Sequence, residues 1–370
     1  MSSVGSQIEE VLDCLQQKIT RDMNDNLTAP FSSDEVWAAL KDMGELKAPG
    51  ADGMPVVFYK KFWSLVGEKV KEEVLAVLNG AVMPEGWNDT VIVLVPKTKS
   101  PEKLKDLKPI SLCNVVYKLI SKVLANRLKV VLSEIISPSQ SAFVPGRLIT
   151  DNVLLAYELT HYLNQRRWGK NGVAAIKLDM SKAYDWVEWC FLEKMMLKLG
   201  FAVQWVERVM KCVSTVSYRI KVNGDYSNKI YLQRGLRQGD PLSPYLFILC
   251  AEGLSALLPK AEEEGRIEGI RVCREAPRIN HLFFADDSLI LMRAYNGDAQ
   301  ELKRILQVYE TGSGQVINRE KSVVLFSPNT SSVGKEEVRQ ELKIVQEAKN
   351  ERYLGPLSQL GNQGRRHLNT

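Results

Sequence analysis

Three aspartates stand in this chain where a carboxylate is costly unless something binds it. Asp286 and Asp287 are neighbours between the apolar runs of HLFFADDSLILM, and Asp179 follows the apolar run GVAAIKL. Adjacent carboxylates repel, and a buried charge without a partner destabilises a fold. A two-residue turn between strands would account for the pair, because aspartate is a common turn residue. The alternative is a divalent-cation site, because Mg²⁺ prefers hard oxygen ligands.

The elements around the aspartates decide whether the three can meet. GVAAIKLDM predicts a strand with Asp179 near its C-terminal end, and HLFFADDSLILM predicts two strands with Asp286 and Asp287 at the tip between them. If this strand and this hairpin are neighbours in one sheet, all three carboxylates lie at one edge. Rigid apolar strands could then hold two ions a few ångströms apart, an arrangement that activates an attacking hydroxyl.

The rest of the chain mixes helices and strands, which predicts the α+β class. Ser32 and Glu35 predict a capping box, a Gly/Pro-rich loop follows at 47–55, and a helix is expected over about 56–79. DTVIVLVPK predicts a buried strand that ends at Pro96. Asn223-Gly224 predicts a hairpin turn. No linker that would divide the chain into independent domains is evident.

Two further helices have predicted N-terminal caps. Thr150 or Asp151 could cap the helix VLLAYELTHYLNQRR, and Asp185 with Glu188 predicts a capping box for the helix that runs to Gly200. Asp185 is therefore interpreted as a helix cap and not as a metal ligand.

Composition excludes few classes of protein. The formal charge of +5 and the pI near 8.7 permit a nucleic-acid partner without requiring one. Six scattered cysteines without a CxxC pair, and three histidines, give no zinc-site spacing and indicate a reduced, intracellular protein. No signal-peptide core and no run of 18 apolar residues occur, so a soluble protein without a membrane partner is expected. Nuclear and cytoplasmic locations are not distinguished, and neither is an oligomeric state.

Two stretches are rich in basic residues. Pro96 to Lys108 carries five lysines against Glu102 and Asp106, and a helical stretch with Lys118, Lys122, Arg127 and Lys129 follows. Both could be solvated faces of the protein, or together they could form a positive wall for phosphates.

Several motifs occur in a fixed order: IKLDMSKAYD, GLRQGDPLSP, HLFFADDSLI, GQVINREKS and YLG. This series resembles the successive motifs of reverse transcriptases. KAPGADGMP, PISLCNVVYKLISKVLANRL and QSAFVPGRLITDN resemble in particular the polymerase domain of plant non-LTR (LINE-type) retrotransposons. The resemblance covers roughly residues 30–355.

The resemblance implies a right-hand polymerase, with fingers and a palm whose antiparallel sheet packs on helices, and with the thumb largely absent. It implies a helical leader at 1–46, fingers and palm at 47–327, the start of the primer grip and thumb at 328–355, and an aberrant tail at 356–370. The reaction would be RNA-directed DNA synthesis with an RNA template, a DNA primer and dNTPs. The alternatives are an inactive remnant that only folds or binds nucleic acid, and an RNA-directed RNA polymerase.

The resemblance also implies a catalytic set. Asp179 and Asp286 would be the main ligands of two Mg²⁺ ions, with Mn²⁺ as an alternative, and Asp287 would support them. Lys321 would protonate or neutralise the leaving pyrophosphate, although it could be a plain surface residue.

A second implied set binds the nucleotide. Tyr184 would exclude a 2′-hydroxyl and favour dNTPs, although it could be a core residue. Gln238 and Gly239 would line the nucleotide pocket, although the glycine could simply serve a turn. Lys97 would reach the triphosphate. Lys108 stands where relatives carry arginine, so it keeps the charge but loses the bidentate fork that suits phosphate.

The remaining implied roles are less specific. Tyr353, Leu354 and Gly355 would begin the primer grip. Trp186 replaces the usual arginine and would put a bulky ring near the active edge. Arg234 and Arg237 could contact template or phosphate, or could pair with Asp240.

Overall fold

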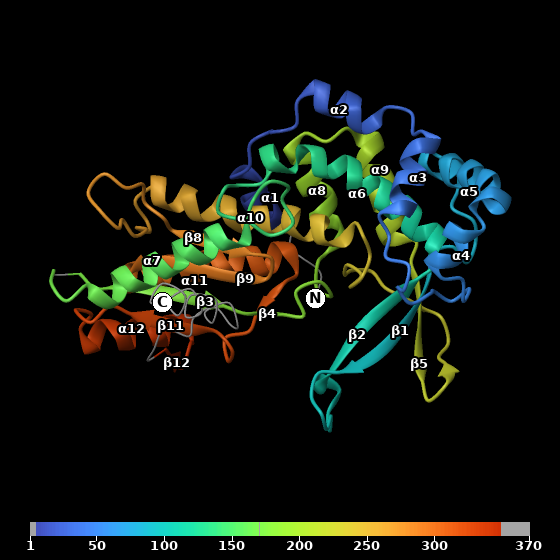
Figure 1. The fold of residues 1–370 in the computed structure, drawn as a ribbon. Helices are drawn as coiled ribbons and strands as arrows, with labels where there is room; N and C mark the ends of the chain where they lie inside the picture. Colours follow the sequence, from blue (N-terminus) through green and yellow to red (C-terminus); the bar gives the residue numbers. More distant parts are fainter. Residues whose placement is uncertain (1–4, 170, 349–370) are drawn as a thin grey trace, which may run out of the picture. The chain divides into compact units, whose positions relative to one another are not determined.

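The computed structural model describes residues 5–169 and 171–348 and divides the chain into two compact units (Figure 1). Unit 1 comprises the described residues of Met1–Leu15, Ile136–Ala183 and Ala251–Thr370. Unit 2 comprises Gln16–Ile135 and Tyr184–Cys250. The chain passes back and forth between the units, which explains why no linker is evident in the sequence. Both units contain helices and a sheet, so the α+β class is confirmed.

Unit 1 contains a five-stranded sheet in the order β12-β11-β3-β9-β8. All neighbours in it are antiparallel except β11 and β12, which are parallel. A two-stranded sheet, β10-β4, accompanies it. The strands are β3 (Val173–Leu178), β4 (Met180–Ser181), β8 (His281–Phe284), β9 (Asp287–Arg293), β10 (Val316–Ile317), β11 (Val323–Phe326) and β12 (Gln346–Glu347).

Helix α7 (Ile149–Gln165) packs on this sheet. Its buried residues Ala156, Leu159 and Leu163 form one apolar cluster with strand residues such as Leu282 and Leu291. The other helices of unit 1 are α1 (Gly5–Asp13), α11 (Asn296–Ser313) and α12 (Ser332–Leu342), and α10 (Ser243–Glu263) runs from unit 2 into unit 1.

The predicted cap of α7 is wrong. The helix begins at Ile149 after Leu148, whose apolar side chain makes no capping hydrogen bond, so neither Thr150 nor Asp151 is the residue that caps it. Asp151 lies inside the first turn instead, where a negative charge still interacts favourably with the helix dipole.

Unit 2 consists of helices and a sheet in which β1 pairs antiparallel with β2 and parallel with β5. Its strands are β1 (Asp89–Pro96), β2 (Leu107–Cys113), β5 (Ser217–Val222), β6 (Asp225–Tyr226) and β7 (Ile230–Tyr231), and a short 3₁₀ helix, η1 (Leu104–Asp106), precedes β2. Its helices are α2 (Arg21–Thr28), α3 (Ser33–Lys41), α4 (Val56–Lys61), α5 (Trp63–Leu78), α6 (Val115–Ile135), α8 (Trp189–Leu199) and α9 (Val203–Ser214).

Of two predictions for unit 2, one holds in part and the other in full. The helix expected over 56–79 is two helices, because the chain departs from helical geometry at Phe62. The hairpin at Asn223-Gly224 is confirmed: Val222 pairs with Asp225, and both turn residues have the positive φ that such a turn requires.

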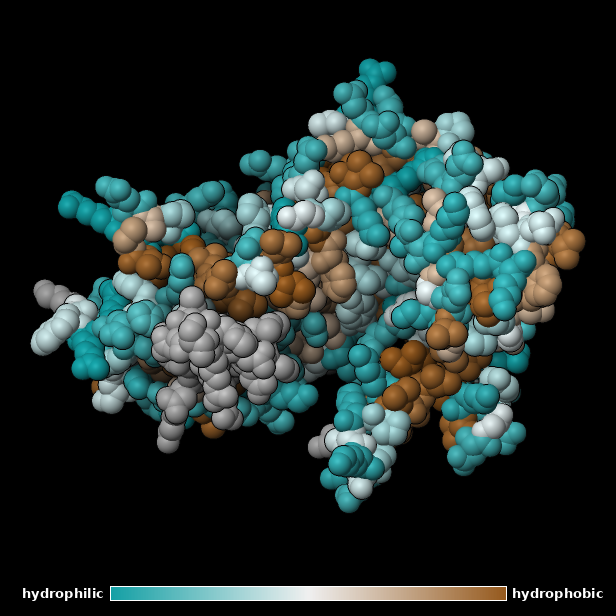
Figure 2. Space-filling model, viewed as in Figure 1, coloured by the Kyte–Doolittle hydropathy of each residue, from teal (hydrophilic) through white to brown (hydrophobic). Residues whose placement is uncertain are grey.

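Strands β1 and β2 form a ribbon that projects from the helices of unit 2 (Figure 1). The prediction that β1 is buried fails toward its C-terminal end, where Val95 is 46% exposed. Figure 2 shows apolar side chains gathered on this ribbon and a polar tip. The end of the strand is exposed because it extends beyond the helices that could cover it.

The predicted capping box of α8 is also wrong. The helix begins at Trp189 after Glu188, and the Glu188 side chain makes no capping hydrogen bond within the described part of the chain. Asp185 lies in the turn before the helix, where the neighbouring carbonyls of Tyr184 and Val187 accept hydrogen bonds from Leu236 and Gly235. The C-terminal end is as predicted: Gly200 ends the helix with φ of +97°.

The capping box of α3 is confirmed. Ser32 Oγ accepts from the backbone N–H of Glu35 at 3.3 Å, and the Glu35 carboxylate accepts from the N–H of Ser32 at 2.8 Å. Val36, Ala39 and Leu40 form the buried face of the helix, as expected.

We therefore expect Ser32→Ala to lower the free energy of unfolding by about 1 kcal/mol, because one backbone N–H at the start of α3 loses its acceptor. Urea unfolding followed by circular dichroism measures the change. Ser33→Ala, one residue further along, is the matched control. Equal effects of the two substitutions would contradict the capping role.

Candidate active site

The strand register of unit 1 brings the predicted aspartates to one end of the sheet. Leu178 pairs with Ser288 across the antiparallel strands β3 and β9. Asp179 follows Leu178 and Asp287 precedes Ser288, so the two aspartates lie at the same end of these strands. Phe284 pairs with Asp287 across β8 and β9. The turn is therefore Ala285-Asp286, and Asp287 is the first residue of β9. The sequence had predicted that Asp287 is part of the tip, and this is wrong by one residue. This strand and this hairpin are thus neighbours in one sheet, which is the condition that the divalent-cation hypothesis set.

The aspartates differ in their surroundings. Asp286 is exposed, whereas Asp179 and Asp287 are half-buried. Lys177 Nζ lies 3.0 Å from Asp287 Oδ1. Sequence reasoning missed Lys177, although residues two apart on a strand share a face, and its place before Asp179 was a usable signal.

The donor chemistry of this edge fits a hard divalent cation. Among the described residues no group of three His, Cys, Asp or Glu side chains that could hold a metal ion occurs. Mg²⁺ does not need such a cage, because it is commonly bound by one or two carboxylates and completes its shell with water and substrate phosphates. Asp179 and Asp286 carry carboxylates of that kind.

The backbone of Asp179 is held by the turn that carries Lys321. The N–H of Asp179 donates to Ser322 Oγ at 3.2 Å, and its carbonyl accepts from the N–H of Asn318 at 2.8 Å. The N–H of Lys321 also bonds to Asn318, and the Lys321 side chain is exposed. Lys321 therefore belongs to the same local structure as Asp179.

A buried histidine lies at the start of β8. His281 Nε2 is 2.6 Å from Ser139 Oγ and 2.7 Å from Ser255 Oγ, and its Nδ1 is 2.5 Å from Asn280 Oδ1. An amide oxygen only accepts, so Nδ1 carries the proton and Nε2 accepts from a hydroxyl. Burial lowers the pKa of His281 to about 3. His281 and Ser255 are buried, and the cluster joins β8 to the 137–139 loop and to α10.

This histidine predicts a pH dependence of stability. Between about pH 6.5 and 3 the unfolded chain protonates this imidazole and the folded chain does not. Protons therefore favour the unfolded state, and the free energy of unfolding falls as the pH is lowered through this window. The contribution of the uncharged His281 to the free energy of unfolding is therefore complete above about pH 6.5.

Replacing His281 by glutamine should reduce the slope by roughly 1 kcal/mol per pH unit between pH 6 and 4, since one proton is no longer taken up on unfolding. Urea titrations at three pH values measure it, and exposed His161→Gln is the control. Unchanged slopes in His281→Gln would contradict the assignment.

Unit 2 holds the residues predicted to bind the nucleotide. The Tyr184 ring stacks on Phe247 with ring centroids 4.8 Å apart. The Gln238 carbonyl accepts from the N–H of Ser111 at 3.2 Å. Gly239 has φ of +102°, and an added Cβ would lie 3.4 Å from the Ser111 carbonyl oxygen. A turn with a positive φ therefore requires this glycine, whatever else it does.

The two arginines of this loop have structural partners. Arg237 and Asp240 are buried and form an ion pair, with Arg237 Nη2 3.0 Å from Asp240 Oδ2. Burial by itself lowers the pKa of Arg237, but nearby Tyr117 and Asp240 raise it above its usual value. Arg234 pairs with Glu188 at 3.4 Å, and its guanidinium lies over the Trp186 ring. The interpretation that Arg237 pairs with Asp240 is thus confirmed.

The predicted lysines lie on the β1–β2 ribbon and are exposed. Lys108 is opposite Val95 in the pairing of the two strands, and the N–H of Lys97 donates to the Asp106 carbonyl at 2.8 Å. Tyr353, Leu354 and Gly355, predicted to begin the primer grip, lie outside the described residues.

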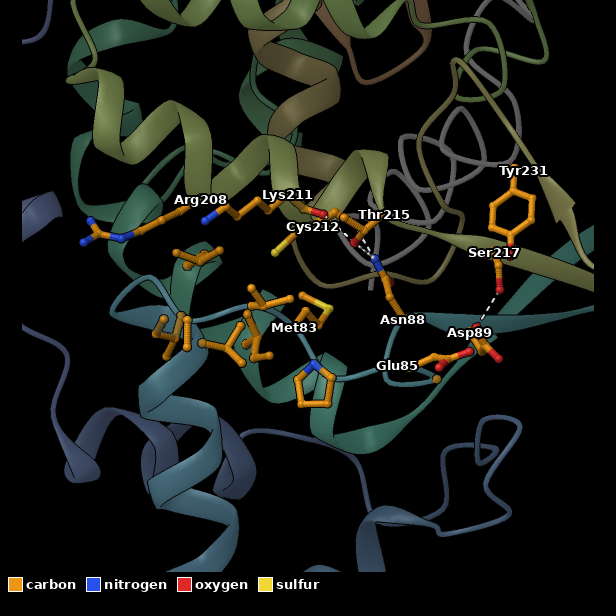
Figure 3. Close-up of a pocket in the computed structure, with 18 of the residues that line it drawn as sticks. Met83, Glu85, Asn88, Asp89, Arg208, Lys211, Cys212, Thr215, Ser217 and Tyr231 are labelled. Carbon is orange, nitrogen blue, oxygen red and sulfur yellow. Dashed lines mark hydrogen bonds between the residues drawn. The ribbon is translucent and has the colours of Figure 1, made fainter.

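Unit 2 also contains a mainly apolar cavity of about 290 Å³ (Figure 3). Its apolar lining includes Met83, and Lys211 lies along it. Asn88 donates to Cys212 and Thr215, and Asp89 accepts from Ser217 at 2.6 Å. Among the described residues, none that is predicted to carry chemistry lines this cavity. It was missed because its walls come from segments far apart in the sequence.

Within the described part of the chain, no helix has the length and apolar character to cross a lipid bilayer.

Three relatives show what the chain is similar to. It is 32% identical over 314 residues to an uncharacterized 149 kDa protein of transposon TX1 from Xenopus laevis, covering 85% of this chain and 23% of that protein. It is 29% identical over 265 residues to a retrovirus-related Pol polyprotein of a type-1 retrotransposable element R2 from Popillia japonica, covering 71% of this chain and 35% of that protein. The chain thus spans about a quarter to a third of these two relatives. A 67-residue stretch, 18% of this chain, is 61% identical to an uncharacterized mitochondrial protein of Arabidopsis thaliana and covers 55% of it.

The family match covers most of the chain. Residues 95–356 match the family described as reverse transcriptase (RNA-dependent DNA polymerase). This range includes the three aspartates and every residue predicted to bind the nucleotide. The chain therefore belongs to the reverse transcriptase family, whose members are nucleotidyltransferases.

Proposed function

We propose that this chain is the polymerase part of a plant non-LTR retrotransposon protein and that it acts as an RNA-directed DNA polymerase. It would add dNTPs to the 3′-hydroxyl of a DNA primer paired with an RNA template. The observation that carries the proposal is the register of β3, β9 and β8, which puts Asp179, Asp286 and Asp287 at one end of one sheet. In this reading, unit 1 provides the palm and unit 2 the fingers.

Asp179 and Asp286 would hold two Mg²⁺ ions, or Mn²⁺ in their place. When bound, such ions make a hydroxyl a better nucleophile and neutralise the charge of the transferring phosphate and the leaving pyrophosphate. Asp287 would have a supporting role, in keeping with its ion pair to Lys177. Lys321 would place a positive charge or a proton at the leaving pyrophosphate, a role supported by its position in the turn that holds Asp179.

Tyr184, Gln238 and Gly239 would bind the incoming nucleotide. The stacking of Tyr184 on Phe247 keeps its ring in one orientation, which a steric gate against a 2′-hydroxyl needs. Lys97 and Lys108 would contact the triphosphate as point charges. Tyr353, Leu354 and Gly355 would begin the primer grip.

The proposal is tested by incubating the purified chain with a primed RNA template, Mg²⁺, and either dNTPs or NTPs. We expect extension with dNTPs that is lost in Asp286→Ala. Extension with NTPs alone would instead indicate an RNA-directed RNA polymerase. Salt-sensitive RNA binding without extension would indicate an inactive remnant.

We also expect Tyr184→Ala to lower the preference for dNTPs over NTPs by about tenfold or more, because the pocket then admits the extra hydroxyl. Tyr184→Phe keeps the ring and should keep the preference. The ratio of kcat/KM for the two substrates measures the effect, and an unchanged ratio in Tyr184→Ala would exclude the gate.

A further inference from the structure

The segment Ser139–Ala142 runs beside the edge strand β8 of unit 1. The N–H of Phe283 donates to the Ser139 carbonyl at 2.8 Å, and the N–H of Ser141 donates to the Phe283 carbonyl at 3.2 Å. The Asn152 side chain donates to the same two carbonyls, at 3.2 and 3.0 Å. The edge strand that leads into the Ala285-Asp286 turn is therefore paired and held in place.

Gln140 lies at the centre of this segment and is only 2% exposed. Its Oε1 accepts two backbone hydrogen bonds, from Ala285 at 3.1 Å and from Ala142 at 3.0 Å. Both donors are N–H groups, so the amide oxygen and not the nitrogen must face them. One side-chain atom thus ties the turn of the hairpin to the neighbouring segment.

The turn needs such a constraint because Ala285 has φ of +52°. This left-handed conformation is unfavourable for a residue with a Cβ and persists only where the surroundings fix it. The next residue is Asp286, so any relaxation of Ala285 changes the direction of the Asp286 carboxylate.

The nitrogen of the Gln140 amide, unlike its oxygen, gains no hydrogen bond within the described part of the chain. Its Nε2 is buried and, among the described residues, has no hydrogen-bond partner. A buried donor left unpaired is unfavourable, and an apolar side chain of similar length would avoid that cost. What Gln140 contributes is therefore the position of its oxygen.

We propose that Gln140 is a positioning residue for the divalent-cation site: through the Ala285 N–H it fixes the turn that aims the Asp286 carboxylate. The inference rests on the proposed function, because that function assigns the cation to Asp286. Gln140 itself contacts no reacting group.

The test measures Mn²⁺ binding to the full chain, without nucleic acid, by electron paramagnetic resonance. Asp286→Asn defines the binding that belongs to the site. Gln140→Met removes the accepting oxygen and also the unpaired donor. Gln140→Glu keeps an oxygen in place, since burial favours the uncharged acid.

We expect Gln140→Met to weaken this binding by about 10- to 100-fold, the usual effect of losing a group that orients a metal ligand. Its melting temperature should stay within a few degrees of that of the unmodified chain, and Gln140→Glu should restore most of the affinity. Hydrogen–deuterium exchange of a peptide containing Ala285 should be faster in Gln140→Met only.

The inference is overturned if Gln140→Met binds Mn²⁺ like the unmodified chain, if Gln140→Glu is as weak as Gln140→Met, or if the chain shows no Mn²⁺ binding that Asp286→Asn abolishes. Site binding that depends on Gln140 but comes without primer extension would refute the proposed polymerase activity and leave the positioning role intact.

Discussion

Asp179→Asn is expected to reduce primer extension by about 10³-fold or more while leaving the protein folded. The substitution removes the negative charge that would hold a divalent cation. Such a cation, when bound, would supply several kcal/mol of transition-state stabilisation, and each 1.36 kcal/mol is a factor of ten in rate. The backbone of Asp179 bonds to Ser322 and Asn318 through its own N–H and carbonyl, which asparagine keeps. Single-turnover extension rates at saturating Mg²⁺ measure the effect.

The matched control is Asp225→Asn, which makes the same chemical change at an exposed position in the β5–β6 hairpin. It should extend primers at the rate of the unmodified chain. Asp287→Asn should have a smaller effect than Asp179→Asn, because Asp287 already pairs with Lys177. If Asp179→Asn extends primers as fast as Asp225→Asn, Asp179 does not hold the ion.

Local patterns in the sequence predicted the elements whose causes are local. The capping box at Ser32 depends on residues three apart, and the Asn223-Gly224 turn depends on two residues that accept positive φ. The strand before Asp179 was predicted because its apolar run is long enough to be buried on both faces. These features need no knowledge of the rest of the chain.

Predictions failed where the outcome depends on a distant segment. A capping box at Asp185 fits the spacing, but the neighbouring backbone instead pairs with Gly235 and Leu236, some fifty residues further on. The position of the hairpin turn shifted by one residue, because the pairing of Phe284 with Asp287 places Ala285 in the turn.

In the candidate site, too, some residues were predicted from local sequence and others depend on distant segments. Asp179, Asp286 and Asp287 stand out because carboxylates interrupt apolar runs. Gln140 gives no such signal, because a single buried amide is recognised only by the N–H groups that it meets. Arg237 could be interpreted in two ways from the sequence, and only its surroundings distinguish them.

The buried pair of Arg237 and Asp240 is expected to contribute strongly to the free energy of unfolding. Asp240 Oδ2 lies 3.0 Å from Arg237 Nη2 and accepts from Tyr117 Oη at 2.6 Å, and Asp240 Oδ1 accepts from the N–H of Leu242 at 2.9 Å. Arg237 and Asp240 are only 5% and 4% exposed. Water therefore cannot compensate either charge if its partner is removed.

Asp240→Asn should accordingly lower the free energy of unfolding by about 3–5 kcal/mol, because it leaves the Arg237 guanidinium buried without a counter-charge. Urea unfolding measures it, with Asp225→Asn as the control for the loss of one negative charge.

The double variant Arg237→Met/Asp240→Leu removes both charges and should be more stable than Asp240→Asn, since a buried ion pair can be replaced by apolar residues at little cost. If Asp240→Asn unfolds at the urea concentration of Asp225→Asn, the pair does not stabilise unit 2. If the double variant is less stable than Asp240→Asn, the cost lies in the lost hydrogen bonds and not in the uncompensated charge.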